Sequence, residues 1–213
     1  MKVALALDAL PASPRARALA LGRRLAGGGD LVLAACLDGD GGEGPELAAR
    51  LGLREAFFVA DPGLAGLGSR ARAQVLARLL ARVRADLILV DAAADGGAGL
   101  FSASLAHSGE WTGLFRAPDL ARDAARPDAV EVTLDLAGVR KRLRVDLPAV
   151  VSVLGEAPAL PAVDPALVRS RTFSLAELEL TPDDLITEPL PAPSLAPAYH
   201  RPVMVTAIDD LLR

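Results

Sequence analysis

The residues with the clearest potential for chemistry follow an apolar stretch in the middle of the chain. Leu87-Ile88-Leu89-Val90 leads into Asp91 and then into the glycine-rich run Asp95-Gly96-Gly97-Ala98-Gly99. Glycine lets backbone N–H groups approach a ligand closely, and a helix that begins after such a run presents its positive end to an anion. The run indicates either a cradle for a phosphate or an ordinary turn, and the sequence leaves both interpretations open.

A second acidic residue follows an apolar run near the amino terminus. Asp8 comes directly after Val3–Leu7, so Ala6 and Leu7 lie next to it. If the two apolar runs are neighbouring parallel strands, Asp8 and Asp91 reach the same edge of the sheet, where open α/β sheets bind ligands. The two carboxylates either line a ligand cleft or cap the turns that follow, and these interpretations stand equally.

Other reactive side chains are few. The two histidines, His107 and His200, are far apart and have no serine or cysteine partner nearby. Cys36, the single cysteine, lies in an apolar run and is predicted to be a buried thiol. No metal-ligand spacing, P-loop or strict dinucleotide-binding motif occurs. The sequence therefore favours binding or carrying over hydrolysis, and no metal site is expected.

The composition indicates an aliphatic core and limits the classes of partner. Hydrophobic residues make up 52% of the 213 residues and aromatic residues only 3%. The formal net charge is −4, which argues against a nucleic-acid partner because phosphates demand a basic face. A single cysteine, no signal-peptide pattern and no membrane-length apolar run predict a cytoplasmic protein without direct membrane insertion.

Apolar runs alternate with helical patterns through the first half of the chain. The predicted strands are Val3–Leu7, Leu31–Leu37, Ala56–Ala60 and Leu87–Val90. Helices are expected after Ser13-Pro14, over Glu46–Leu51, from Ser69 and over Leu100–Ala106. This alternation predicts an α/β fold with an open, mostly parallel, doubly wound sheet of the kind that binds adenine nucleotides.

The second half of the chain has a different pattern. Val130–Asp135 and Val139–Val145 alternate and are joined by a short turn, which predicts an antiparallel hairpin. In its second strand, Arg140, Arg142 and Arg144 share one face. This arginine row faces either an acidic partner or solvent. Prolines crowd the chain after Gly155. We expect residues 1–155 to form a nucleotide-binding-like α/β domain, and residues 156–213 to form a partner-recognition segment and an extended arm that wraps a partner subunit.

One stretch carries a family resemblance. Residues 138–158 contain Leu147-Pro148-Ala149-Val150-Val151-Ser152, which resembles the Leu-Pro-Ala-Val-Val-Thr signature after the hairpin in the beta (small) subunit of electron-transfer flavoproteins. The first strand and the proline-rich arm agree with that family. The resemblance implies an electron carrier, not an enzyme, that pairs with an alpha-like subunit holding most of the FAD. Electrons would pass from a flavin-dependent dehydrogenase to a downstream acceptor.

The sequence also departs from the family pattern. Gly96-Gly97-Ala98-Gly99 stands where the family has the Asn-Gln-Thr-Gly that cradles AMP, and only the last glycine matches. The stretch from Asp8 to Pro14 is too short for the usual basic pair and aromatic loop. These departures imply a divergent member whose AMP site is weakened or empty.

The resemblance also places a partner-docking segment late in the chain. The family has Leu-Pro followed by an apolar and basic helix, and Pro165, Leu167, Val168, Arg169 and Arg171 fit that pattern. Asp164 stands where the anchoring leucine is expected, and Leu160-Pro161 offers another register. An ordinary surface helix is the alternative interpretation.

Two other functions remain compatible with the sequence. The chain could be a flavin-free module that binds an adenine nucleotide. It could also be a structural subunit of a larger oxidoreductase that has lost its cofactor contacts.

Overall fold

The computed structural model describes residues 1–7, 16–27, 31–37, 43–92, 99–136, 138–155 and 161–185. The helices are α1 (Ala16–Ala26), α2 (Gly44–Arg50), α3 (Ser69–Arg82) and α4 (Leu100–Gly109), with short 3-10 helices η1 (Pro62–Leu64), η2 (Pro165–Leu167), η3 (Ala176–Leu178) and η4 (Pro182–Asp184). The strands are β1 (Val3–Leu7), β2 (Leu31–Leu37), β3 (Glu55–Ala60), β4 (Leu87–Asp91), β5 (Thr112–Ala117), β6 (Asp119–Arg122), β7 (Ala129–Leu136), β8 (Val139–Asp146), β9 (Ala149–Val153) and β10 (Arg169–Phe173).

Seven strands of the described chain form one sheet in the order β10-β3-β2-β1-β4-β9-β5, with parallel pairing between neighbours. Every residue of the central strands β1, β4 and β9 is buried. Strands that are covered on both faces are mostly apolar, which is why these segments show no alternation. Asp91 in β4 and Ser152 in β9 are their buried polar residues. The predicted α/β fold with a mostly parallel sheet is confirmed.

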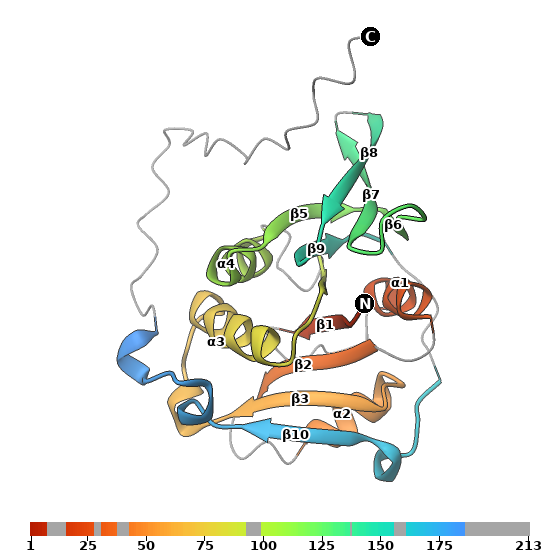
Figure 1. Cartoon of the computed structure of the whole chain (residues 1–213). Helices are drawn as coiled ribbons and strands as arrows, with labels where there is room; N and C mark the ends of the chain where they lie inside the picture. Colours follow the sequence, from red (N-terminus) through yellow and green to blue (C-terminus); the bar gives the residue numbers. More distant parts are fainter. Residues whose placement is uncertain are drawn as a thin grey trace.

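Helices cover the two faces of this sheet (Figure 1). One face packs against α1, α2 and the smaller sheet in a core that contains Leu5, Leu19 and Leu47. The opposite face packs against α3, α4 and the segment after β10, in a core that contains Leu80 and Leu105. The sheet is therefore wound on both sides, as expected.

The end of α3 leads directly into β4. Arg84 adopts a left-handed backbone (φ 56°), its N–H donates to the Ala81 carbonyl, and the Ala85 N–H donates to the Leu80 carbonyl. This pair of bonds satisfies the last helical carbonyls and reverses the chain within a few residues. The short connection leads straight into β4, which pairs with β1 and β9.

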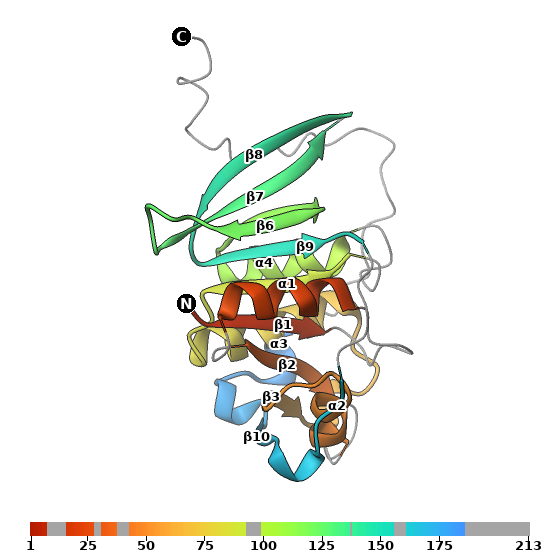
Figure 2. The ribbon, with the colours of Figure 1, turned by 90° about the vertical axis from the view of Figure 1, so that its right-hand side faces the viewer.

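A smaller antiparallel sheet, β6-β7-β8, extends from the parallel sheet (Figure 2). β7 and β8 pair from Leu136↔Val139 to Ala129↔Asp146, which confirms the predicted hairpin and shows that two residues separate its paired ends. Gly138 has φ 84°, the conformation that such turns require. β6 was not predicted from the sequence.

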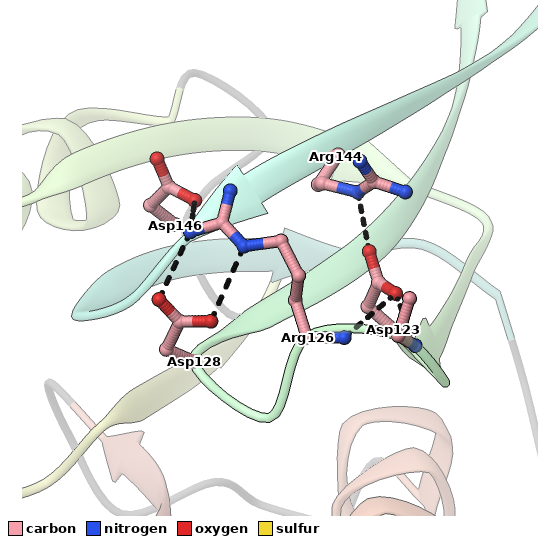
Figure 3. Close-up of polar contacts among 6 residues, drawn as sticks. Asp123, Arg126, Asp128, Arg144 and Asp146 are labelled. Atoms are coloured by element: carbon pink, nitrogen blue, oxygen red, sulfur yellow. Dashed lines mark hydrogen bonds and ion pairs between the residues drawn. The ribbon is translucent and has the colours of Figure 1, made fainter.

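The turn between β6 and β7 is tied to β8 by charged side chains (Figure 3). Asp123 is buried, and its Oδ1 accepts the N–H groups of Ala125 and Arg126 at 2.8 and 3.1 Å, while its Oδ2 accepts from Arg144. Arg126 forms ion pairs with Asp128 at 2.9 Å and Asp146 at 3.1 Å. Arg144, one of the predicted arginine row, therefore has an acidic partner within the chain.

Asp123 is expected to make this sheet sensitive to acid. The Ala125 N–H and the Arg144 guanidinium hold the pKa of Asp123 below its ordinary value of 3.8. A carboxylate whose pKa is lowered by folding stabilises the folded protein. Its full contribution is present when the pH is above the ordinary pKa of the unfolded chain, and it is lost as the pH falls through the lower pKa of the folded protein. We expect Asp123→Asn to lower the thermal unfolding midpoint by several degrees at neutral pH. In acid, the midpoints of the variant and of the unmodified protein should become equal.

The matched control for this measurement is Asp135→Asn on the same hairpin. Asp135 is exposed and lies opposite Arg140, and exposed ion pairs contribute little to stability. The control should change the midpoint only slightly at either pH. Equal losses in the two variants, or a gap that persists in acid, would contradict the role given to Asp123.

Within the described residues, the chain after Gly155 packs on the first part of the molecule. β10 pairs with β3 in parallel, and Leu175, Leu178 and Leu180 are buried in the core that contains α3. Residues 161–185 of the segment 156–213, which was predicted to wrap a partner, thus pack on this chain, and residues 186–213 lie outside the described residues. The division of the chain at residue 155 stays a prediction.

Candidate functional site

β1 and β4 end side by side at the point where the strand order reverses direction. Their register pairs Leu5 with Leu89, so Leu7 and Asp91, each two residues further along, reach the same level. β2 and β3 continue on the β1 side, and β9 and β5 on the β4 side. Open α/β sheets bind ligands at this switch point, outside the carboxyl ends of the strands. The structure thus brings Ala6, Leu7 and Asp91 to one edge.

The side chains at this edge are mostly buried. Ala6 packs into one core and Leu7 into the other, at 1% and 6% exposure. Asp91 is 5% exposed, and a carboxylate at a strand end accepts hydrogen bonds from hydroxyl or N–H donors. Asp8, the other predicted carboxylate, lies outside the described residues.

Helix α4 begins at the same edge because it follows β4. Its N-cap is Gly99, which has φ 69° and no side chain with which to cap the helix. The Ser102 hydroxyl donates to the Gly99 carbonyl at 3.2 Å. The first N–H groups of a helix have no partner within it, and the helix dipole favours an anion there. Asp95, Gly96, Gly97 and Ala98 lie outside the described residues.

Two arginines that the sequence did not single out also lie at this edge. Arg17, in the first turn of α1, donates to the Pro118 carbonyl at 2.9 Å, and its stem passes beside Gly155. Arg116 is exposed at the end of β5 and has a left-handed backbone (φ 63°). The local sequence predicts neither position, because the packing of α1 places Arg17 and the irregularity in β5 places Arg116.

Ser152 explains the irregularity in β5. The pairing of β5 with β9 shifts register between Leu114 and Ala117, and the Arg116 N–H donates to Ser152 Oγ at 3.1 Å. Ser152 is 1% exposed, so its hydroxyl replaces the ladder bond that the bulge removes. The hydroxyl at the end of Leu147–Ser152 thus holds the backbone of the bulge at Arg116, near the carboxyl end of β5.

Taken together, this edge suits a ligand with two kinds of group. The start of α4 can hold an anionic group through backbone N–H donors. Asp91 can accept a hydrogen bond from a hydroxyl or amino group. In the part of the chain that the structure describes, no three metal-ligating side chains gather into a site.

Comparison of the sequence with models of protein families gives one match. The family model for the electron transfer flavoprotein domain matches residues 11–177. The chain belongs to the electron transfer flavoprotein family. The match spans most of the parallel sheet, the smaller sheet and β10. A search of curated proteins finds no match to the chain.

Proteins of this family are electron carriers associated with flavin. A flavin performs the redox chemistry when it is bound, and the protein contributes placement and electrostatics. No helix within the described ranges is long and apolar enough to span a membrane.

The segment predicted to dock a partner has a different conformation from the one expected. The predicted helix is wrong: Pro165 and Leu167 bound the short η2, and Arg169 and Arg171 lie on β10. Asp164 accepts the Ala166 N–H at 2.9 Å and caps η2. Alternation along Val168-Arg169-Ser170-Arg171-Thr172-Phe173 was the available signal, because alternate side chains of a strand share a face.

The docking residues are nevertheless accessible, with one exception. Leu167 is 58% exposed, and Arg169 and Arg171 are exposed on the edge strand. Val168 is half-buried and packs against the core. A solvent-facing leucine beside two arginines is compatible with docking, and its use as a docking surface stays a prediction.

Asp91→Asn separates the two interpretations of the buried carboxylate. If Asp91 binds a ligand hydroxyl, the variant should lower the affinity of the assembled protein for FAD roughly tenfold or more, because a hydrogen bond to a charged group is lost. Its thermal unfolding midpoint should then stay close to that of the unmodified protein. FAD titration of the deflavinated complex measures the first quantity. A lower midpoint with unchanged FAD affinity would assign Asp91 to turn capping instead.

Proposed function

We propose that the chain is a beta-like subunit of an electron transfer flavoprotein. It pairs with an alpha-like subunit that carries FAD, and the pair moves electrons from a flavin-dependent dehydrogenase to a downstream acceptor in the cytoplasm. The observation that carries this proposal is the family match over residues 11–177. The beta assignment is supported by the resemblance of residues 138–158 to the beta-subunit signature.

The geometry of the carboxyl edge supports a role as one wall of the cofactor site. FAD contains phosphates, ribityl and ribose hydroxyls and a redox-active ring. The start of α4 offers donors for a phosphate, and Asp91 offers an acceptor for a hydroxyl. Arg116 adds an exposed positive charge at the same edge, which stabilises negative charge nearby. These described residues therefore fit part of the cofactor, while the alpha-like partner holds the rest.

We expect the AMP site of this protein to be weakened or empty. Where the beta-subunit pattern has the Asn-Gln-Thr side chains that contact AMP, this sequence has Gly96-Gly97-Ala98. Those side chains supply donors and acceptors that glycine and alanine lack. We infer that AMP binds weakly or not at all at the start of α4, which leaves the backbone N–H groups there for a phosphate of FAD.

The experiment is to co-express the chain with the alpha-like subunit and to quantify the nucleotides released on denaturation. We expect roughly one FAD per heterodimer, as one cofactor per shared site requires, and little AMP. Stoichiometric AMP would overturn the inference about the nucleotide position.

The other functions predict different outcomes of the same experiment. A colourless homodimer that binds ATP would favour the flavin-free nucleotide-binding module. A colourless chain that cannot be separated from a larger dehydrogenase would favour a structural subunit. Either result would contradict the proposed function.

A further inference from the structure

The β7–β8 hairpin extends beyond the strand that supports it. β6 pairs with β7 only from Val130 to Thr133, so β7 pairs with β8 alone from Leu134 to Leu136. Figure 1 shows the end of this two-stranded ribbon pointing away from the parallel sheet. Val139, where β8 begins, is 56% exposed. The ribbon therefore places an apolar side chain at a protruding end of the molecule.

Positive charge gathers directly behind this end. The three residues that follow Val139 are exposed cations, namely Arg140, Lys141 and Arg142. Their partners in the register include one carboxylate, Asp135, which lies opposite Arg140. The ion pairs found among the described residues involve none of the three cations. The excess of positive charge is local, because the whole chain carries a net charge of −4.

At the base of the ribbon, the charges are balanced within the chain. Arg144 binds the buried Asp123, as Figure 3 shows. Asp119, which lies beside Thr133 in the register, is bound by Arg24 at 2.6 Å. These carboxylates already have cationic partners, so they do not neutralise the cations at the end of the ribbon.

The cations at the end of the ribbon lie on both of its faces. Alternate side chains of a strand point to opposite faces, so Lys141 lies on one face and Arg140 and Arg142 lie on the other. A protein that packs against one face would contact only part of this charge. A layer of lipid headgroups contacts both faces, because the ribbon meets it end-on. The exposed Val139 suits the same layer, since an apolar side chain gains by leaving water at the headgroup boundary.

We propose that Val139–Arg142, called here the hairpin tip, docks the protein peripherally on an anionic membrane surface. Negatively charged headgroups attract lysine and arginine side chains that come within a Debye length of them. The contact is confined to the headgroup region and spans nothing. It goes beyond the proposed function and does not depend on it, because it uses neither the carboxyl edge nor the cofactor.

Two other roles of the hairpin tip make different predictions. A β-ribbon also enters grooves of DNA, but nucleic-acid sites spread many cations over basic proteins, and this chain is acidic. Charged side chains on an edge strand also hinder unwanted strand pairing, and β8 is an outer strand of the smaller sheet. The second role requires no contact with lipid.

The test is flotation of the purified full chain with vesicles made of equal parts of phosphatidylcholine and phosphatidylglycerol, at low salt. We expect R140Q/R142Q to lower the partitioning onto these vesicles roughly tenfold or more, because each cation close to an anionic surface contributes about fivefold. The matched control, R50Q/R78Q, removes two exposed arginines from α2 and α3, away from the hairpin (Figure 1). It should change the partitioning less than about twofold, because charges far from the surface are screened.

A third variant tests the apolar part of the hairpin tip. Val139→Ser keeps every charge and should lower the partitioning severalfold, because it removes an apolar side chain from the contact. Circular dichroism checks that the fold of each variant is retained. Equal partitioning onto vesicles of phosphatidylcholine alone, or equal losses in R140Q/R142Q and R50Q/R78Q, would overturn the proposal.

The other roles would appear in the same variants. If R140Q/R142Q aggregates more readily and still partitions like the unmodified protein, the cations only protect the edge strand and the proposal fails. If an oligothymidine strand binds the chain more tightly than the vesicles do, and R140Q/R142Q loses that binding, the hairpin tip is a nucleic-acid site and the proposal fails as well.

The complex with the alpha-like subunit gives a separate check. It should float with the anionic vesicles as the free chain does. If only the free chain floats, the partner subunit covers the hairpin tip, and docking of the assembled protein on a membrane is overturned. The flavin content of the complex tests the proposed function independently of this result.

Discussion

Deletion of residues 186–213 is expected to abolish stable association with the alpha-like subunit while the rest of the chain stays folded. Leu185, the last described residue, is 3% exposed and belongs to the core around α3. The deletion therefore keeps every described core contact. It removes a proline-rich stretch whose apolar residues, such as Val203 and Leu211, need a surface to pack on. Because large subunit interfaces are mostly apolar, we expect the affinity to fall roughly a hundredfold or more.

Co-purification and size-exclusion chromatography measure the association, and thermal unfolding of the free chain measures the fold. A longer deletion, of residues 175–213, is the control because it also removes Leu175, Leu178 and Leu180 from the core. It should unfold the chain or lower its midpoint strongly. If the shorter deletion keeps the partner bound, or destabilises the free chain as much as the longer one, the tail packs on this chain and the account of a wrapping arm fails.

The second large effect is expected at the start of α4. Gly99 and Gly66 both have left-handed backbones, with φ 69° and 77°. A branched side chain in that conformation costs roughly 1–2 kcal/mol at either position. Gly66 lies between η1 and α3, and a Cβ there meets nothing within 4 Å, so Gly66→Val reproduces the strain away from the candidate site.

Only Gly99→Val places a side chain where the helix N–H groups face the carboxyl edge. We expect it to lower the affinity of the deflavinated complex for FAD roughly tenfold or more, because charge-assisted hydrogen bonds to a phosphate are lost. Gly66→Val should match its loss of stability and keep the FAD affinity. Equal FAD affinity in the two variants would contradict the placement of the cofactor at the start of α4.

Much of the fold could be predicted because its central elements have local signals. β1, β2 and β4 are apolar runs, and strands covered on both faces are mostly apolar. The hairpin alternates on either side of Gly138, whose positive φ suits a two-residue turn. In these segments, local preference and tertiary environment agree.

The edges of the sheets could not be predicted in the same way. β10 exposes Arg169 and Arg171, so its sequence is typical of a surface segment, and its pairing with β3 joins positions far apart in the chain. β5 contains the irregularity at Arg116, which breaks the alternation that marks a strand. The approach of Arg82, at the end of α3, to the ring of Phe173 depends on the pairing of β10 with β3.

The candidate site was predicted in part. Adjacent β1 and β4 place Leu7 and Asp91 at one edge, as parallel pairing of two apolar runs implies. Gly99 begins the helix that follows. Arg17 and Arg116 were not predicted, because their positions depend on a carbonyl from Pro118 and a hydroxyl from Ser152.

We propose that this chain forms only half of a redox pocket, which a partner subunit completes. The absorbance spectrum of the complex, purified natively and without added flavin, tests it most directly. We expect a yellow heterodimer with the spectrum of an oxidised flavin, which bleaches on reduction. A colourless preparation, or a chain that purifies as a stable solitary monomer, would contradict it.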